Sequence, residues 1–191
     1  MSVKQLNESP NSLRLSPVQT SGNHPPRRDV TSDVVFRHPL PSDGKAMWSL
    51  VCDNGGLDLN SPYAYLMACR NWPATCVLAE DADGPVGLVV AYRQATRPQA
   101  LFVWQIGVAL RRRGTGLGSD MLAWLIKQDG PAFLETTITP TNSASRALFA
   151  GFARRMGVGL TDCAWLNADD FPGQHEGEDL FTIGPFKTNK E

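Results

Sequence analysis

Long apolar runs are missing from this sequence, and their absence excludes a helical membrane protein. A helix that crosses a bilayer needs about 18 to 20 consecutive apolar residues, and no segment of the 191-residue chain approaches that length. Residues 1–33, rich in Ser, Asn, Gln and Pro, also lack the apolar core of a secretory signal. We therefore expect no membrane partner, a cytoplasmic location, and a disordered N-terminal tail over residues 1–33.

An excess of charge of either sign is missing as well. The chain carries 18 basic and 19 acidic side chains, for a formal net charge of -1. A protein that holds nucleic acid through its overall field needs a clear positive excess. We expect no nucleic-acid partner, since only the triplet Arg111-Arg112-Arg113 favours one.

Paired cysteines are the third absence. The chain has four cysteines, at positions 52, 69, 76 and 163, and none forms a C-x-x-C pair. That spacing favours neither a disulfide framework nor a zinc site. We expect no metal, and we expect all four thiols to be small buried hydrophobes.

Hydrophobic periodicity predicts one domain, residues 34–186, followed by a short C-terminal tail, residues 187–191. Strands are expected at 34–37, 75–79, 86–92, 101–108, 133–138, 158–165 and 179–183. Helices are expected after Pro41-Ser42, after Ser61-Pro62, after the glycines at 114–118, and after Asn142. The second helix is predicted to bury Tyr63, Leu66 and Met67, and the fourth to bury Ala144, Ala147, Leu148 and Gly151. This order of elements indicates a mixed α/β sheet.

A glycine-rich loop between a strand and a helix is the strongest chemical signal. Gly114, Gly116 and Gly118 let the backbone approach a ligand closely. The first N–H groups of the following helix have no partner within the helix, so they form an anion site. The triplet 111–113 adds positive charge, and a pyrophosphate is the expected guest. The loop lacks the Gly-Lys-Ser/Thr of a Walker A motif and the G-x-G-x-x-G of a dinucleotide fold; a chance surface loop is the remaining alternative.

These features resemble the GNAT superfamily of acyl-CoA-dependent N-acetyltransferases. Residues 113–118 fit its Q/R-x-x-G-x-G/A loop, and Asn142, Leu148-Phe149 and Gly151-Phe152 follow in the family's order. The resemblance implies an α/β fold with a mixed, mostly antiparallel sheet of six to seven strands and about four flanking helices. It also implies a splay between strands 101–108 and 133–138 that admits the thioester, whose oxygen is held by backbone N–H groups. Acetyl-CoA is then the co-substrate, bound by Gln105, Ile106, Gly107, Val108, Arg113, Gly114, Thr115, Gly116, Leu117, Gly118, Ser119 and Asn142.

Longer segments are similar to the L-2,4-diaminobutyrate acetyltransferases of ectoine synthesis. Residues 58–66 match D-x-N-S-x-Y-x-Y-L, and residues 101–105, 139–145 and 171–185 carry further family segments. The similarity spans residues 34–186. It implies transfer of acetyl to the 4-amino group of L-2,4-diaminobutyrate, a product used for an osmolyte, and a homodimer.

The substrate carries two amines and a carboxylate, so its site is expected to combine acidic groups with hydrogen-bond donors. The resemblance points to Asp58, Asn60, Ser61, Tyr63, Trp104, His175 and Glu178. Simpler roles stay open: Ser61 as a helix N-cap, Trp104 as core, and the acidic residues as solvated charges.

Direct attack by a neutral amine in a ternary complex is the expected mechanism. An amine with a pKa near ~10 has to lose a proton first, and candidate bases are Asp58, Glu135, His175 and Glu178. Many superfamily members protonate the thiolate with a tyrosine where this chain has Phe149. Tyr63 or water is expected to replace it, or the thiolate leaves unprotonated, since a thiol with a pKa near ~8.5 gives a fair leaving group.

Two other functions remain open at this point. One is an acetyltransferase of a different amine, such as a polyamine or a protein N-terminus. The other is a non-catalytic module that senses acyl-CoA, favoured only by the missing tyrosine at position 149.

Overall fold

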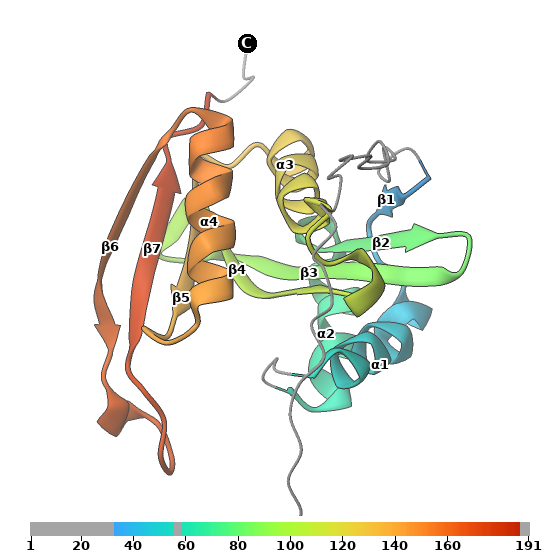
Figure 1. The fold of residues 1–191 in the computed structure, drawn as a ribbon, viewed down its shortest axis with the longest axis horizontal. Helices are drawn as coiled ribbons and strands as arrows, with labels where there is room; N and C mark the ends of the chain where they lie inside the picture. The colour runs from blue at the N-terminus through green and yellow to red at the C-terminus, as the bar shows by residue number, and fades with distance from the viewer. Residues whose placement is uncertain (1–32, 56–58, 188–191) are drawn as a thin grey trace, which may run out of the picture.

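A seven-stranded sheet runs through the middle of the molecule, with helices on both sides (Figure 1). The computed structural model describes residues 33–55 and 59–187. The strand order is β1-β2-β3-β4-β5-β7-β6. Every neighbouring pair is antiparallel except β4 and β5, which are parallel. The mixed, mostly antiparallel α/β sheet predicted from the sequence is confirmed. The strands are β1 Val35–Arg37, β2 Val77–Asp81, β3 Gly84–Gln94, β4 Arg97–Val108, β5 Phe133–Ile138, β6 Gly159–Leu166 and β7 Glu178–Gly184.

Two pairs of helices enclose the sheet. α1 (Gly44–Asn54) and α2 (Pro62–Asn71) lie on one side, and α3 (Leu117–Asp129) and α4 (Ser143–Met156) lie on the other (Figure 1). Each pair covers its own apolar core, because each strand of the sheet sends alternate side chains to opposite faces. The half of the sheet built from β5, β7 and β6 has α4 on one side; in the described part of the chain no helix covers its other side.

The predicted starts of α2 and α4 hold, whereas α1 begins at Gly44, after a 3-10 turn at Pro41–Asp43 that contains the predicted cap Ser42. Ser61 is the N-cap residue of α2, with Pro62 in the first helical position. Asn142 caps α4, where its side-chain oxygen accepts a hydrogen bond from the Ser145 N–H at 3.0 Å. α4 ends at Gly157, whose φ of 65° is the left-handed conformation typical of a helix stop.

The predicted buried face of α2 is wrong. The helix buries Tyr65, Ala68 and Cys69, whereas the side chain of Tyr63 is 67% exposed. The run from 62 to 69 is apolar on more than one side, so periodicity alone does not select a face. The position of the sheet selects it.

The predicted buried face of α4 is also wrong. Phe149, Phe152 and Ala153 are buried, while Ala144 and Ala147 are exposed. A phenylalanine removes far more apolar surface from water than an alanine does. The helix therefore turns its aromatic side chains toward the sheet.

Two of the four cysteines differ from expectation. Cys69 and Cys76 are buried as predicted, and burial raises the pKa of the Cys76 thiol to about 12. Cys52 and Cys163 are exposed. Cys163 lies on β6, an edge strand whose side chains are mostly exposed on both faces. Within the described ranges, no helix combines the length and the hydrophobicity of a membrane span.

Candidate active site

The parallel strands β4 and β5 part after only three residue pairs. The last paired residues are Phe102 and Glu135. Beyond them, β5 pairs only with β7 and β4 pairs only with β3. The two strands therefore form the splay that the family resemblance implied, and backbone groups of β4 are left without a strand partner on this edge.

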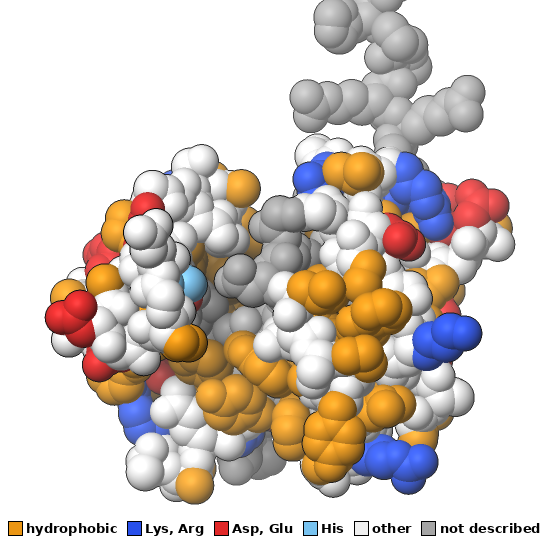
Figure 2. Space-filling view, turned by 90° about the horizontal axis from the view of Figure 1, so that it is seen from below, with side chains coloured by type: hydrophobic (Ala, Val, Ile, Leu, Met, Phe, Trp, Pro, Cys, Tyr) orange, Lys and Arg blue, Asp and Glu red, His pale blue; other side chains and the backbone are white. Residues whose placement is uncertain are grey.

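A cavity of about 470 Å³ opens at the splay. Its walls come from β4, from β5 and the loop after it, from the start of α4, and from the loop between β6 and β7. From below, the surface is hollowed between these C-terminal strands and the lobe of α1 and α2, which carries a cluster of exposed hydrophobic side chains (Figure 2). The residues that line this cavity include Asn60, Tyr92, Trp104, Gln105, Ile106, Thr136, Asn142, Phe149, His175 and Glu178.

A β-bulge at Trp104 lies on the wall of this cavity. On β3, Val90 pairs with Gln105 and Ala91 with Val103, so Trp104 is an extra residue of β4. Phe102 and Trp104 both line the cavity. The next side chain, Gln105, accepts a hydrogen bond of 2.7 Å from the Tyr65 hydroxyl of α2. Sequence periodicity cannot show this shift, because the bulge breaks the alternation of sides.

The glycine-rich loop has the geometry of an anion site. Gly114 and Gly116 have φ values of 75° and 91°, a region that other residues rarely adopt. Gly116 is the N-cap residue of α3, so the N–H groups of Leu117 and Gly118 open the helix. A Cβ atom at Gly118 would lie 3.3 Å from the Leu148 side chain, which shows how closely α3 packs on α4.

Two of the three arginines before this loop, Arg111 and Arg112, are paired with carboxylates, whereas Arg113 bonds neutral main-chain oxygens and keeps its charge. Arg111 pairs with the Asp81 carboxylate, and the Arg112 Nε donates to the same carboxylate at 2.9 Å. Arg113 donates to the main-chain oxygens of Asn54 (2.9 Å) and Val108 (3.3 Å). The triplet therefore holds the loop against β2, α1 and β4. Besides Arg113, the loop offers an anion its backbone N–H groups and the positive end of α3.

One further cation reaches the start of α3. Arg155, near the end of α4, donates to the Ser119 hydroxyl at 3.0 Å and to the Asp120 carboxylate at 2.6 Å. Its side chain is half exposed. It is the arginine that the structure places beside the first turn of α3.

Four predicted substrate residues come together in the cavity: Asn60, Trp104, His175 and Glu178. His175 stacks on Phe171, with ring centroids 3.9 Å apart. The Thr141 hydroxyl donates to the Glu176 carboxylate at 2.8 Å, which ties the loop bearing His175 to the turn before α4.

Two other predicted residues lie outside the cavity, and the position of a third is not described. Ser61 and Tyr63 are exposed and do not line the cavity. Asp58 lies outside the described residues.

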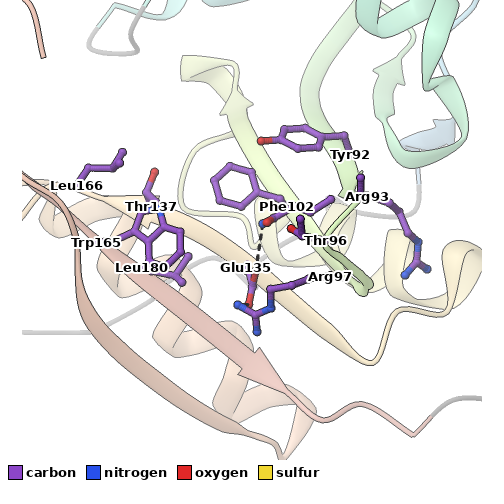
Figure 3. A pocket seen from close by; sticks show the side chains of 12 residues that line it. Tyr92, Arg93, Thr96, Arg97, Phe102, Glu135, Thr137, Trp165, Leu166 and Leu180 are labelled. Atoms are coloured by element: carbon purple, nitrogen blue, oxygen red, sulfur yellow. Dashed lines mark hydrogen bonds and ion pairs between the residues drawn. The ribbon is translucent and has the colours of Figure 1, made fainter. Parts of the chain in front are cut away.

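Glu135 lies in a neighbouring pocket instead (Figure 3). Its carboxylate is fully buried and pairs with Arg97 at 2.6 Å. It also accepts hydrogen bonds from Gln94 (3.2 Å) and Thr182 (3.4 Å). The pocket shares Tyr92 and Phe102 with the splay cavity, but both Glu135 oxygens are already occupied.

Sequence reasoning missed several residues of the cavity. Tyr92, whose pKa is raised by burial, lines it from β3. Thr136, Thr137 and Thr139 line it from β5 and the loop that follows. The run of threonines was visible in the sequence, but their place at the splay follows only from strand order.

The sequence matches the model of the acetyltransferase (GNAT) family over residues 45–152. The chain belongs to the GNAT acetyltransferase family. Among its relatives is the L-2,4-diaminobutyric acid acetyltransferase of Marinococcus halophilus, 43% identical over 157 residues, which cover 80% of this chain and 91% of the relative. The enzyme of the same name from Nocardia farcinica is 40% identical over 82% of this chain and 83% of its own length.

A solved structure adds the ligands of one relative of this GNAT chain. Diaminobutyrate acetyltransferase EctA from Paenibacillus lautus was determined with L-2,4-diaminobutyric acid and coenzyme A. It is 41% identical to this chain, with a TM-score of 0.77, and the match covers 83% of this chain and 99% of the other. The family model and the coenzyme A bound by this relative agree with acetyl-CoA as the co-substrate.

Proposed function

We propose that this GNAT chain transfers acetyl from acetyl-CoA to the 4-amino group of L-2,4-diaminobutyrate. The product, N4-acetyl-L-2,4-diaminobutyrate, would serve ectoine synthesis. The observation that carries the proposal is that segments shared with the diaminobutyrate acetyltransferases meet at the β4/β5 splay. They bring Asn60, Trp104, His175 and Glu178 to one cavity beside the acyl site. The relative that is 41% identical was solved with both this diamine and coenzyme A, which supports the choice of substrate.

The coenzyme is expected to lie along the glycine loop and the free edge of β4. The pyrophosphate would accept hydrogen bonds from the N–H groups at the start of α3. The pantetheine arm would pair with the β4 segment from Gln105 to Val108, which β5 has left. The thioester would then sit at the apex of the splay, within reach of the cavity that holds the diamine.

The amine has to lose a proton before it attacks the thioester. Among the candidate bases in the described chain, Glu178 and His175 line the cavity, whereas Glu135 is occupied by Arg97. We assign Glu178 as the base, directly or through a water molecule, and His175 as a substrate contact. None of the four cysteines lines the cavity, so an acetyl-cysteine intermediate has no support and direct attack is preferred.

The leaving thiolate has no tyrosine donor on α4. The buried Phe149 lines the cavity at that position, and Tyr63 does not reach it. A thiol has a pKa near ~8.5, so the thiolate is a fair leaving group. We propose that water protonates it.

Turnover with acetyl-CoA tests the proposed function. The acceptors would be L-2,4-diaminobutyrate, ornithine, lysine and spermidine, and the acetylated nitrogen would be identified by NMR. We expect diaminobutyrate to give the highest kcat/KM, with acetyl on the 4-amino nitrogen. Equal use of lysine or spermidine would contradict the substrate assignment. Binding of coenzyme A without turnover of any amine would favour a sensing module.

Three broader statements belong to the same proposal. We propose that residues 34–186 form the catalytic domain between tails 1–33 and 187–191; Asp33, at the boundary, pairs with Arg112 at 3.0 Å. We propose that the enzyme acts in the cytoplasm, in osmoprotection. We also propose a homodimer, which sedimentation velocity would test.

A further inference from the structure

Just beyond the last backbone pair of β4 and β5, a side-chain hydrogen bond joins the two strands. The ladder ends at Phe102 and Glu135. At the next step, the Thr136 hydroxyl donates to the Val103 carbonyl oxygen at 2.9 Å. Thr136 is 5% exposed, and its neighbours Leu134 and Ile138 on the same face of β5 belong to the core under α3 and α4. The bond is therefore buried and lies at the apex of the splay.

Without this bond, the Val103 carbonyl would be a buried acceptor with no strand partner. A buried acceptor left unsatisfied costs about 1–3 kcal/mol. A backbone N–H of β5 would satisfy it, but backbone hydrogen bonds hold neighbouring strands about 4.8 Å apart. The strands β4 and β5 would then stay paired beyond this point. The threonine hydroxyl satisfies the carbonyl without a β5 backbone N–H, so the strands can separate at once.

The hydrogen bond from Thr136 also reduces the negative partial charge that the Val103 oxygen presents where the thioester is expected. Val103 and Thr136 both line the splay cavity, next to the β4 backbone that is proposed to hold the acetyl oxygen. A bare carbonyl oxygen there would repel the negative charge that develops on that oxygen during attack. A hydroxyl donor on Val103 reduces this repulsion.

We infer that Thr136 is a positioning residue that holds the β4/β5 splay open at its apex and shields the acyl site from the Val103 carbonyl. The residue acts through the strand and its carbonyl, and it is not a catalytic residue. The inference rests on the proposed use of acetyl-CoA, but not on the identity of the amine.

A matched control lies in the same sheet. Thr75, 8% exposed, donates through its hydroxyl to the Ala91 carbonyl of β3 at 2.6 Å. It makes the same type of buried bond, but on the side of β3 that faces β2 and not between β4 and β5; the Trp72 carbonyl oxygen lies 2.9 Å from the same hydroxyl. Replacing either threonine by valine removes one hydroxyl and retains the shape of the side chain.

The experiment compares T136V, T136S and T75V with the wild-type chain, using whichever amine the wild type acetylates best. We expect T136V to lower kcat about tenfold, less than the roughly 10²–10³ of a lost oxyanion-hole donor, because the hydroxyl acts through the Val103 carbonyl. Its dissociation constant for coenzyme A, measured by calorimetry, should stay within about twofold of wild type, because the pyrophosphate site is unchanged. T136S keeps the hydroxyl and should recover most of kcat. T75V should lose a similar amount of thermal stability with kcat unchanged.

Two results would overturn the inference: a kcat of T136V equal to that of T75V, or a kcat of T136S as low as that of T136V. If T136V does not fold, T136A against T136S gives the same comparison. A wild-type chain that uses an amine other than diaminobutyrate would contradict the proposed substrate and leave the Thr136 comparison valid.

Discussion

Two glutamates that look alike in the sequence have different surroundings in the fold. Glu135 is fully buried, and its oxygens are bound to Arg97, Gln94 and Thr182. Glu178 begins β7 at the rim of the splay cavity and keeps partial access to solvent. A base needs an oxygen that reaches the proton it removes. The surroundings therefore favour Glu178 for catalysis and Glu135 for holding β5 to its neighbours.

Replacing Glu178 by glutamine tests this distinction. The substitution retains size but removes the base, and we expect kcat to fall by about 10²-fold or more. The affinity for coenzyme A should stay near wild type, because the proposed pyrophosphate site is at the N-terminus of α3 and its glycine loop does not line the cavity that Glu178 lines. Asp169→Asn, an exposed carboxylate in the same loop region, is the control and should have full activity. A Glu178→Gln enzyme with normal kcat would move the base elsewhere.

In the loop before α3, the backbone and the side chains have different roles. Its glycines provide the conformation and the N–H groups, and its arginines fasten the loop to Asp81 and to main-chain oxygens. Reading the triplet as ligand charge was reasonable from sequence alone, because arginine beside a glycine loop suits an anion. The carboxylate that pairs with Arg111 belongs to Asp81, 30 residues earlier on the β2–β3 hairpin, and the sequence does not show that the two side chains meet.

A pair of glycine substitutions tests the role of this loop. At Gly116, with φ of 91°, an alanine is strained by about 1–2 kcal/mol and disturbs the N-terminus of α3. We expect the KM for acetyl-CoA to rise severalfold. Gly151→Ala, inside α4, is the control. A Cβ there meets only the end of Arg154, at 3.8 Å, so the helix should gain up to about 1 kcal/mol with an unchanged KM. Equal KM values for the two variants would argue against the loop as the pyrophosphate site.

At the scale of the whole molecule, two ionic clusters fasten the N-terminal half of the sheet. Arg37 of β1 pairs with Asp43 at 2.5 Å and with Glu80 of β2 at 2.6 Å. Asp81, at the end of the same strand, pairs with Arg111 and Arg112. Hydrogen bonds from these arginines lower the pKa of both Asp81 and Asp43 in the folded chain.

These lowered pKa values predict a loss of stability in acid. An unfolded aspartate has a pKa near ~3.9, so below about pH 4 the unfolded chain binds more protons than the folded one. The contribution of Asp81 is complete above that pH and disappears as the pH falls toward its folded value. We expect the melting temperature to drop between pH 5 and pH 3. Asp81→Asn should lower it at pH 7 and flatten this dependence, whereas Asp83→Asn, with an 85% exposed side chain, should change neither. Parallel pH curves for wild type and Asp81→Asn would contradict this account.

The order of strands and helices, the caps at Ser61 and Asn142, and the glycine anion loop were all readable from the sequence. Each depends on residues close together along the chain: alternation within a strand, a cap beside its helix, a glycine at a left-handed position. The family resemblance added the splay and the acyl donor. The family resemblance also marked the segments that contain Trp104, His175 and Glu178. The structure places these three predicted residues in the cavity.

The remaining features depended on contacts between distant segments. The buried faces of α2 and α4 were set by where the sheet and the large aromatic side chains meet. Arg111 and Arg112 pair with Asp81, Glu135 pairs with Arg97, and a bulge interrupts β4 at Trp104. Thr136 acquired its role because β5 leaves β4 one residue earlier. Charge pairing, burial and strand separation are properties of three-dimensional neighbours, and local sequence does not encode which neighbours those are.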